Sequence, residues 1–310
     1  IIRTLLAVMD INFQRNEFLK HLESEGKSFN TIKNYRPDLN CFGDYWLDRK
    51  KTAEMTEFTV TEVQEYAHYL DNKYPSENSK RRRVQALRLF FDYLVGLSLF
   101  PDNPVRKIGA FAKVLDKPNP VAFPLIQKMV SDFTEIKKDN KLAHRNLVLI
   151  GLIYGAGLKV SDIAKLKKQH ILDGKTIRVM VSRSKREPYS VPLNSFWSDI
   201  LKEYLSDLQE HQDKTGLHFN DLLFNANAYQ ILSGGLSSRG IELIFKELST
   251  KYKTKMTARS LRQSCLFKWI LMQVPDTTIK EWMGVQPVYS LKPYKDLLTE
   301  SPSEYAFNEF

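Results

Sequence analysis

The sequence predicts a mainly α-helical protein with two domains, of which the second also carries a small antiparallel β-hairpin. Apolar residues recur with the period of a helix from residue 10 to about residue 108, and again through most of the second half. A proline-rich stretch without periodicity lies between the two halves. We therefore expect a helical domain over residues 1–108, a linker over 109–124 and a second domain over 125–310. A chain of 310 residues with 43% hydrophobic content can form two cores.

Four amphipathic helices are expected in the first domain. The first has an apolar stripe that includes Phe18, and the second runs over residues 28–47, where Pro37 marks a kink or the first turn. Thr61 is expected to cap the third helix and Ser79 to open the fourth. These predictions concern local structure only.

The hairpin of the second domain is predicted from two short segments. Residues 176–181 are rich in β-branched side chains, a polar turn follows, and residues 189–193 return as a second strand. Two domains of this kind, joined by a linker, suit a protein that encloses an elongated partner between them. Many unrelated proteins share the outline, so it identifies no function.

The composition favours a polyanionic partner. The formal net charge is +10, which points to nucleic acid first and to an anionic membrane second. No apolar run is long enough for a membrane span. Cys41 and Cys265 lie far apart and no histidines have the spacing of a ligand pair, so we expect no metal and two free thiols in a reducing cytoplasm.

Two segments of the first domain resemble the core-binding domain of the tyrosine recombinases, the family of phage-type integrases and Xer-like proteins. The family's second-helix signature is similar to FNTIKNYRPDLNCFGDYW. The last helix and exit of that domain are similar to SKRRRVQALRLFFDYLVGLSLFPDNPVRKI. The resemblance implies a helical domain that clamps DNA.

Three segments of the second domain continue the resemblance. The segment of the first catalytic arginine is similar to RNLVLIGLIYGAGLKVSDIAKL, and the His-x-x-Arg box has its counterpart in TARSLRQSCLFKWI. The segment that ends in the nucleophilic tyrosine is similar to IKEWMGVQPVYSLKPY. The five segments follow the family's order over nearly the whole chain.

The resemblance implies that Tyr294 is the nucleophile of a site-specific recombinase. Its hydroxyl would attack a DNA phosphodiester and leave a 3′-phosphotyrosine and a free 5′-hydroxyl. The phosphotyrosine keeps the bond energy, so rejoining needs no ATP, metal or other cofactor. The alternative is a half-buried tyrosine whose hydroxyl anchors the C-terminal segment.

Cations are needed because the transition state carries extra negative charge, which guanidinium forks can bind. The resemblance assigns the scissile phosphate to Lys159, Arg259 and Arg262; the two arginines lie one helical turn apart and therefore share a face. It assigns protonation of the leaving 5′-oxygen to Lys185. The match at this turn is ambiguous by a residue or two, so Arg183 is the rival.

Three positions depart from the family's pattern. Lys159 stands where the first arginine is expected, Arg259 replaces the usual histidine, and Val285 replaces a later histidine or tryptophan; the acidic Asp162 is kept. Lysine loses the planar fork and arginine is too basic to act as a general base. Each loss typically costs ~10²–10³ in rate. We expect residual recombinase activity, either impaired by these three changes or kept because the remaining cations take over the lost roles.

Two alternatives stay open. One is a weak or inactive DNA-binding protein of the same fold with an architectural or regulatory role. The other is a basic helical protein that binds RNA or another protein.

Two groups of basic residues are candidates for DNA contact. The first opens the predicted fourth helix and continues along it: Lys80, Arg81, Arg82, Arg83 and Arg88. The second follows Lys159: Lys165, Lys167 and Lys168. The resemblance places the first group against double-stranded DNA, although such a charge run can also be a solvated face. Binding of this kind weakens steeply with salt.

The segment after Leu298 holds Tyr305, Phe307 and Phe310 among acidic residues. The resemblance implies that it passes to a neighbouring subunit of a homo-tetramer on two DNA sites, and a frayed terminus is the alternative. The expected location is the cytoplasm, in association with the nucleoid. The DNA target, any accessory protein and the direction of recombination cannot be read from the sequence.

Overall fold

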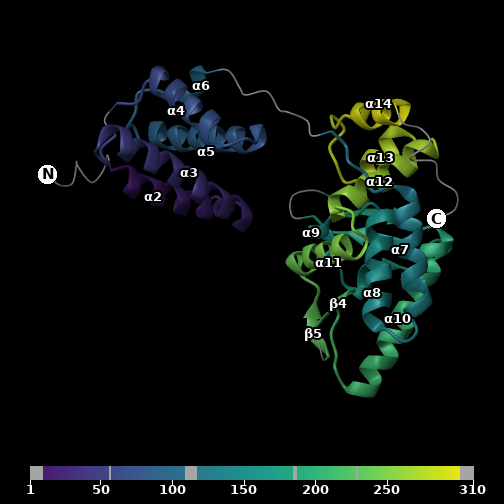
Figure 1. Ribbon diagram of the computed structural model, residues 1–310. Helices are drawn as coiled ribbons and strands as arrows, with labels where there is room; N and C mark the ends of the chain where they lie inside the picture. The colour runs from purple at the N-terminus through teal and green to yellow at the C-terminus, as the bar shows by residue number, and fades with distance from the viewer. Residues whose placement is uncertain (1–9, 56, 109–116, 184–186, 228–229, 301–310) are drawn as a thin grey trace. The chain divides into compact units, whose positions relative to one another are not determined.

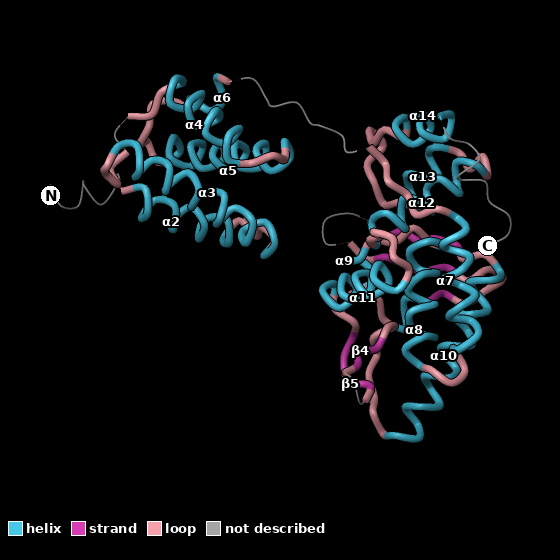
Figure 2. Tube along the Cα trace, viewed as in Figure 1, coloured by secondary structure: helices cyan, strands magenta, loops and turns pink. Residues whose placement is uncertain are grey.

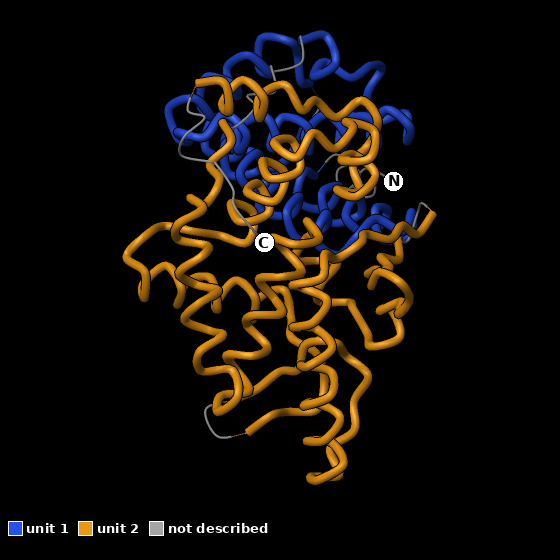
Figure 3. The backbone as a smooth tube through the Cα atoms, turned by 90° about the vertical axis from the view of Figure 1, so that its right-hand side faces the viewer, with its two compact units in different colours: residues 1–116 blue, residues 117–310 orange. Residues whose placement is uncertain are grey.

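The computed structural model describes residues 10–55, 57–108, 117–183, 187–227 and 230–300. The chain divides into two compact units, residues 1–116 and 117–310, which are coloured separately in Figure 3 and described separately here. This boundary falls inside the linker predicted at 109–124. Lys185 and the C-terminal segment 301–310 lie outside the described residues.

The described part of unit 1 is helical, as the sequence predicts (Figure 1). Its elements are α2 (Ile11–Ser24), α3 (Phe29–Lys50), α4 (Val60–Lys73), α5 (Glu77–Gly96) and the short α6 (Pro104–Lys107). Aromatic rings fill the core between α3, α4 and α5. Phe58 stacks on Phe91 with ring centroids 4.6 Å apart, and Phe42 meets Phe58 edge-on at 5.3 Å.

Two helix starts differ from the prediction. Thr59, not Thr61, caps α4: its hydroxyl accepts from the backbone N–H of Glu62, whose carboxylate accepts from the N–H of Thr59. This reciprocal capping box satisfies two backbone donors, which a cap at Thr61 does not achieve. Ser76, not Ser79, caps α5: the Ser76 hydroxyl oxygen accepts a hydrogen bond from the backbone N–H of Ser79.

Unit 2 is mostly helical, with two small antiparallel sheets (Figure 2). Its helical elements are α7 (Phe123–Ile136), α8 (Lys141–Ile150), the π-helical turn η1 (Gly151–Gly155), α9 (Val160–Ile163), the 3₁₀ turn η2 (Lys168–His170), α10 (Ser195–Thr215), α11 (Ser238–Lys251), α12 (Ala258–Leu271), α13 (Asp276–Trp282) and α14 (Lys292–Glu300). Its strands are β1 (Ile171–Leu172), β2 (Arg178–Val181), β3 (Tyr189–Pro192), β4 (Phe224–Ala226) and β5 (Ile231–Gly235).

The predicted hairpin is present as β2 and β3, in a register that pairs Val181 with Tyr189. The prediction missed β1, which adds a third strand beside β2, and the separate pair β4–β5. These strands have two to five residues, too few for a visible alternation.

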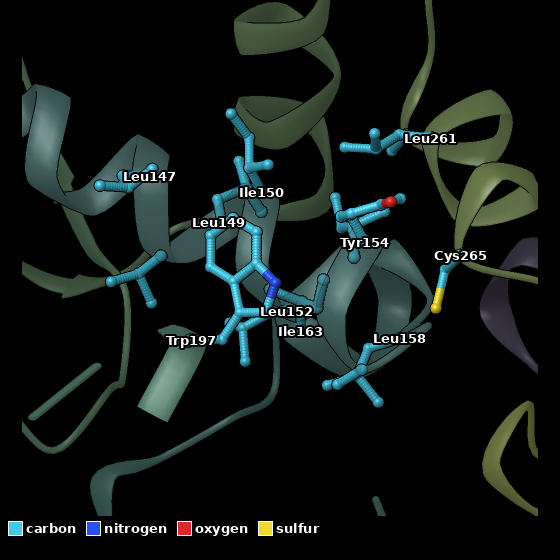
Figure 4. Packing of buried hydrophobic residues seen from close by; sticks show 14 of the residues in the cluster. Leu147, Leu149, Ile150, Leu152, Tyr154, Leu158, Ile163, Trp197, Leu261 and Cys265 are labelled. Atoms are coloured by element: carbon cyan, nitrogen blue, oxygen red, sulfur yellow. The ribbon is translucent and has the colours of Figure 1, made fainter. Parts of the chain in front are cut away.

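The core of unit 2 surrounds α12, which is buried along most of its length. Figure 4 shows the region where Leu152 and Tyr154 of η1 lie in one apolar cluster with Leu261 of α12 and Trp197 of α10. Helices α13 and α14 also pack against α12 (Figure 1). Side chains on α12 are therefore held from several directions.

The end of the predicted linker packs on α12 instead of standing free. The N–H of Val121 donates to Ser264 Oγ at 2.8 Å, and the N–H of Asn119 donates to Gln263 Oε1 at 2.9 Å. Helix α7 then begins at Phe123, which is buried. Backbone donors that enter a core need partners, and α12 supplies them here.

We predict that Ser264→Ala destabilises unit 2 by about 1–3 kcal/mol, because it leaves the buried N–H of Val121 without an acceptor. The side chain of Ser264 is only 1% exposed, so water cannot replace it. Urea unfolding followed by tryptophan fluorescence measures the loss. Ser131→Ala, at an exposed serine of α7, is the control. Equal midpoints for the two variants would contradict the prediction.

Candidate active site

The N-terminus of α12 positions two of the predicted site residues. Thr257 Oγ1 accepts from the N–H of Ser260 at 3.0 Å, and Ser260 Oγ accepts from the N–H of Thr257 at 2.8 Å. This cap defines where the helix begins. Arg259 therefore falls in the first turn and is exposed, while Arg262 falls in the second turn and is half-buried.

The guanidinium of Arg262 lies between two backbone carbonyls. Its Nε donates to the oxygen of Gly157 at 2.5 Å, and its Nη2 donates to the oxygen of Met283 at 2.5 Å. Burial lowers the pKa of Arg262, and nearby Tyr189 and Asp162 act in the opposite direction. Two loops thus fix the orientation of the fork, as binding of a phosphate at one defined place requires.

Two glycine turns bring these loops close to the site. Gly157 and Gly284 have φ angles of 62° and 60°, where a residue with a Cβ is strained. A Cβ at Gly284 would lie 2.7 Å from both Arg183 Nη2 and Tyr189 Oη. The carbonyl of Gly284 is 3.5 Å from Lys159 Nζ, which donates to it. Lys159 and Arg183 therefore approach the same turn.

Arg183 was the alternative to Lys185 for protonation of the leaving 5′-oxygen, and the structure describes where its side chain lies. Its guanidinium lies over the ring of Tyr189, 4.0 Å from the centroid, beside Gly284. Tyr189 opens β3 and is buried, and burial raises the pKa of its hydroxyl. Nothing in the sequence marks Tyr189 as a neighbour of Arg262, because 73 residues of chain separate them on different elements.

Tyr294 lies in α14 and is 8% exposed. Its ring meets Phe267 of α12 edge-on, with centroids 5.7 Å apart. Its hydroxyl is hydrogen-bonded to the hydroxyl of Tyr289 at 2.9 Å. A buried phenol is also what the alternative of a structural anchor predicts, but this hydroxyl has another phenol as its partner, at the edge of the arginine site.

Tyr289 connects Tyr294 to the arginines. It lies in the loop between α13 and α14 and is half-buried. Burial and the hydrogen bond with Tyr294 raise the pKa of Tyr289, whereas the charges of Arg262 and Arg259 oppose that rise. Tyr289 was not among the residues predicted for the site. Its only available signal was its place five residues before Tyr294.

The two supporting positions also lie here. Asp162, in α9, is partly exposed, and its charge acts on both Arg262 and Tyr189. Val285 follows Gly284 and packs against the core of unit 2. Its side chain offers no hydrogen bond, as its residue type predicts.

The comparisons decide the family. The pattern of the Phage integrase family matches residues 125–300, and that of the phage integrase N-terminal SAM-like domain matches residues 16–96. The chain belongs to the phage integrase family.

Named relatives agree with this membership in the phage integrase family. Tyrosine recombinase XerC of Listeria welshimeri is 24% identical over 286 residues, which are 92% of this chain and 93% of the relative. Tyrosine recombinase XerD of Oceanobacillus iheyensis is 25% identical over 228 residues, 73% of this chain and 74% of the relative.

Solved structures share the fold of this phage integrase family member. The XerH site-specific recombinase bound to palindromic difH substrate has a TM-score of 0.68 at 17% identity, covering 88% of this chain and 79% of that one. Lambda integrase (residues 75–356) bound to DNA has a TM-score of 0.67 at 16% identity, covering 95% of this chain and 99% of that one.

Several of the basic residues on α5 that we expected to contact DNA are paired within unit 1 instead. Lys80 is 8% exposed and pairs with Asp71 at 2.7 Å and with Glu77. Arg82 pairs with Asp38 at 2.9 Å, and Asp38 is 1% exposed. Burial raises the pKa of Asp38, while Arg82 and Arg83 oppose the rise.

Arg83 also turns inward, with its guanidinium 3.6 Å from the centroid of the Tyr74 ring. These side chains hold α5 against its neighbours because a buried carboxylate needs cationic partners. Arg81 is exposed, and Arg88 is partly buried, with Nη1 donating to Gln85 Oε1 at 3.2 Å. Of the predicted α5 group, Arg81 presents its side chain most openly to solvent.

The three lysines after α9 also differ in how exposed their side chains are. Lys165 and Lys167 are exposed. Lys168 is partly buried: its Nζ donates to Gln212 Oε1 and lies 5.8 Å from the centroid of the Phe219 ring. Burial lowers the pKa of Lys168. Its side chain helps to hold η2 against α10.

Among the residues that the structure describes, no group of histidine, cysteine and carboxylate side chains is arranged to hold a metal ion. Both cysteines are free and buried. No helix in the described ranges is long and apolar enough to cross a membrane.

Proposed function

We propose that this phage integrase family member is a site-specific recombinase that cleaves and rejoins DNA through a 3′-phosphotyrosine at Tyr294. Enzymatic strand transfer is the activity of the tyrosine recombinases that it resembles. One observation supports the choice of Tyr294: its hydroxyl meets that of Tyr289, which lies within the electrostatic reach of Arg262 and Arg259. A phenol beside oriented guanidinium groups suits attack on a phosphodiester.

In the proposed reaction, the Tyr294 Oη–P bond forms as the P–O5′ bond breaks, and the proton of the phenol passes to solvent water. Arg262, Arg259 and Lys159 stabilise the charge on the non-bridging oxygens of the phosphate. Lys185 supplies the proton that the leaving 5′-oxygen takes up. In the reverse step a 5′-hydroxyl attacks the phosphotyrosine and Tyr294 leaves, so no outside energy source is needed.

Arg183 has a different part in this proposal. Its guanidinium is too basic to give up a proton readily at neutral pH, so it is a poor general acid. Its position over Tyr189 and beside Gly284 suits a cation that fixes the turn next to the phosphate. Lysine is the better acid of the two candidates, which is why Lys185 keeps that role.

Double-stranded DNA is the proposed partner, bound by a homo-tetramer on two sites in the cytoplasm, in association with the nucleoid. The exposed residues Arg81, Lys165 and Lys167 are the proposed phosphate contacts, together with the partly buried Arg88. Removal of one such contact weakens binding to all sequences and makes binding less sensitive to salt.

A covalent-adduct assay tests the proposed function. A duplex is first selected from a random-sequence pool by repeated binding, and a version nicked near the cleavage point then traps the phosphotyrosine. We expect a protein–DNA adduct that maps by mass spectrometry to the peptide containing Tyr294. Specific binding without any adduct would favour the architectural alternative. If the protein shows no preference for duplex DNA, both the recombinase and the architectural DNA-binding protein are excluded.

We predict that Lys159→Arg accelerates adduct formation on the order of tenfold, because it restores a planar fork where lysine offers one point charge. Lys159 already approaches the carbonyl of Gly284, so an arginine there starts within reach of the site. Single-turnover rates on the selected nicked duplex measure the gain. Lys246→Arg, at an exposed lysine of α11, is the control. An unchanged or lower rate would show that Lys159 does not contact the phosphate.

A further inference from the structure

The pair of phenols at the site raises the question of what Tyr289 does. In unit 2 the hydroxyls of Tyr289 and Tyr294 are 2.9 Å apart. Tyr289 lies on a loop whose backbone is fixed near it: its own N–H donates to the oxygen of Gln286 at 2.9 Å. Tyr289 is more exposed than Tyr294.

A lone phenol is a poor nucleophile at neutral pH because tyrosine's reference pKa is about 10. Arg259 and Val285 occupy the positions where the family carries a histidine or tryptophan, so neither position supplies an imidazole. A hydrogen bond donated to the attacking oxygen stabilises the charge that develops as its proton leaves. The Tyr289 hydroxyl is within hydrogen-bonding distance of that oxygen.

The surroundings decide which of the two phenols donates. Attack requires the Tyr294 hydroxyl to lose its proton, so the hydrogen bond that remains between the two oxygens is donated by Tyr289. Burial, and then the hydrogen bond with Tyr294, raise the pKa of Tyr289. The charges of Arg262 and Arg259 of α12 act on Tyr289 and oppose the rise in its pKa. The Tyr294 hydroxyl thus has a phenol as its partner, and that phenol is the one on which the charges of α12 act.

We infer that Tyr289 is a positioning residue for the nucleophile: its hydroxyl donates a hydrogen bond to Tyr294 Oη and holds that oxygen toward the cations of α12. This inference rests on the proposed function, because it assumes that Tyr294 attacks the phosphate. Tyr289 takes no proton and forms no bond to phosphorus. It supplies a hydrogen bond that stabilises the phenolate.

The first measurement needs no DNA. Fluorotyrosine at position 289 is titrated by fluorine NMR in the full chain, with and without Tyr294→Phe. Because the hydrogen bond with Tyr294 raises the pKa of Tyr289, we expect Tyr294→Phe to lower the titration midpoint by about one pH unit. Tyr252→Phe, which removes a hydroxyl bonded to Asp132 at 2.8 Å elsewhere in unit 2, should leave the midpoint unchanged. An equal midpoint in all three proteins would overturn the pairing.

The second measurement is adduct formation by Tyr289→Phe on the selected nicked duplex. We expect the rate to fall about tenfold to a hundredfold, since a hydrogen bond to a charged group is worth about 1.5–3 kcal/mol. The adduct should still map to Tyr294, and binding to the intact duplex should be unchanged. Tyr252→Phe again serves as the control.

Two results would overturn the positioning role while leaving the pairing intact. One is an unchanged rate in Tyr289→Phe, and the other is an adduct that maps to Tyr289 itself. If the unaltered protein forms no adduct at all, the proposed function is wrong, and the positioning role of Tyr289 is then wrong as well. In that case the DNA-free titration still shows whether the two hydroxyls are paired, so the two failures are distinguishable.

Discussion

Tyr294→Phe is expected to abolish the covalent protein–DNA adduct, with at least a 10⁴-fold loss of rate, roughly the effect of removing a nucleophile with no substitute. The change removes one oxygen and leaves the ring, which meets Phe267 edge-on in the core of unit 2. The variant should therefore fold and should bind the selected duplex as tightly as the unaltered chain.

The stability cost of Tyr294→Phe should be small. The lost hydroxyl bonds only one described side chain in the structure, Tyr289, and a neutral hydrogen bond is worth about 0.5–1.5 kcal/mol. Tyr252→Phe, which loses a comparable hydroxyl contact with Asp132, controls for that cost and should form adduct normally. An adduct that persists in Tyr294→Phe would mean that another residue attacks, and peptide mapping would identify it.

Arg262→Ala is expected to slow adduct formation by ~10²–10³ because it removes an oriented donor to the transition-state charge. The structure shows why this arginine should matter: its Nε and Nη2 are fixed by the carbonyls of Gly157 and Met283, each at 2.5 Å. A guanidinium held at both positions needs little reorganisation when the phosphate arrives. Single-turnover kinetics on the nicked duplex measure the loss.

Stability must be separated from chemistry in this variant. Arg262→Ala leaves two buried carbonyls without their donor, at a cost of about 1–3 kcal/mol. Arg262→Lys keeps a charge but not the fork, so a large rate loss there, with a smaller change in unfolding midpoint, assigns the effect to phosphate binding. Arg239→Ala, at an exposed arginine of α11 paired with Glu242, is the control. Rates within a few-fold of the unaltered protein in both Arg262 variants would remove Arg262 from the mechanism.

The comparison of prediction and structure is clearest at particular residues. The helical class, the hairpin at β2–β3 and the family were predicted correctly, because periodicity and ordered motifs are properties of the sequence alone. Helix starts were wrong by two or three residues at Thr59 and Ser76. Several serines and threonines precede each helix, and only the hydrogen bonds choose among them.

The sequence by itself determined the residue types of the site and their order: a phenol at Tyr294, an arginine at Arg262, and the altered positions Lys159 and Val285. The tertiary structure alone decided that Tyr294 is paired with another phenol and that Arg183 lies beside Gly284.

Tertiary structure also decided which partners the basic side chains of α5 have. Lys80, Arg82 and Arg83 turn toward carboxylates and a ring of their own unit, and Arg81 faces solvent. The same run of basic residues can bind DNA or pair with a buried carboxylate such as Asp38, and the sequence does not distinguish the two. The physical reason is that burial and pairing depend on distances between residues far apart in the chain, which periodicity and spacing do not contain.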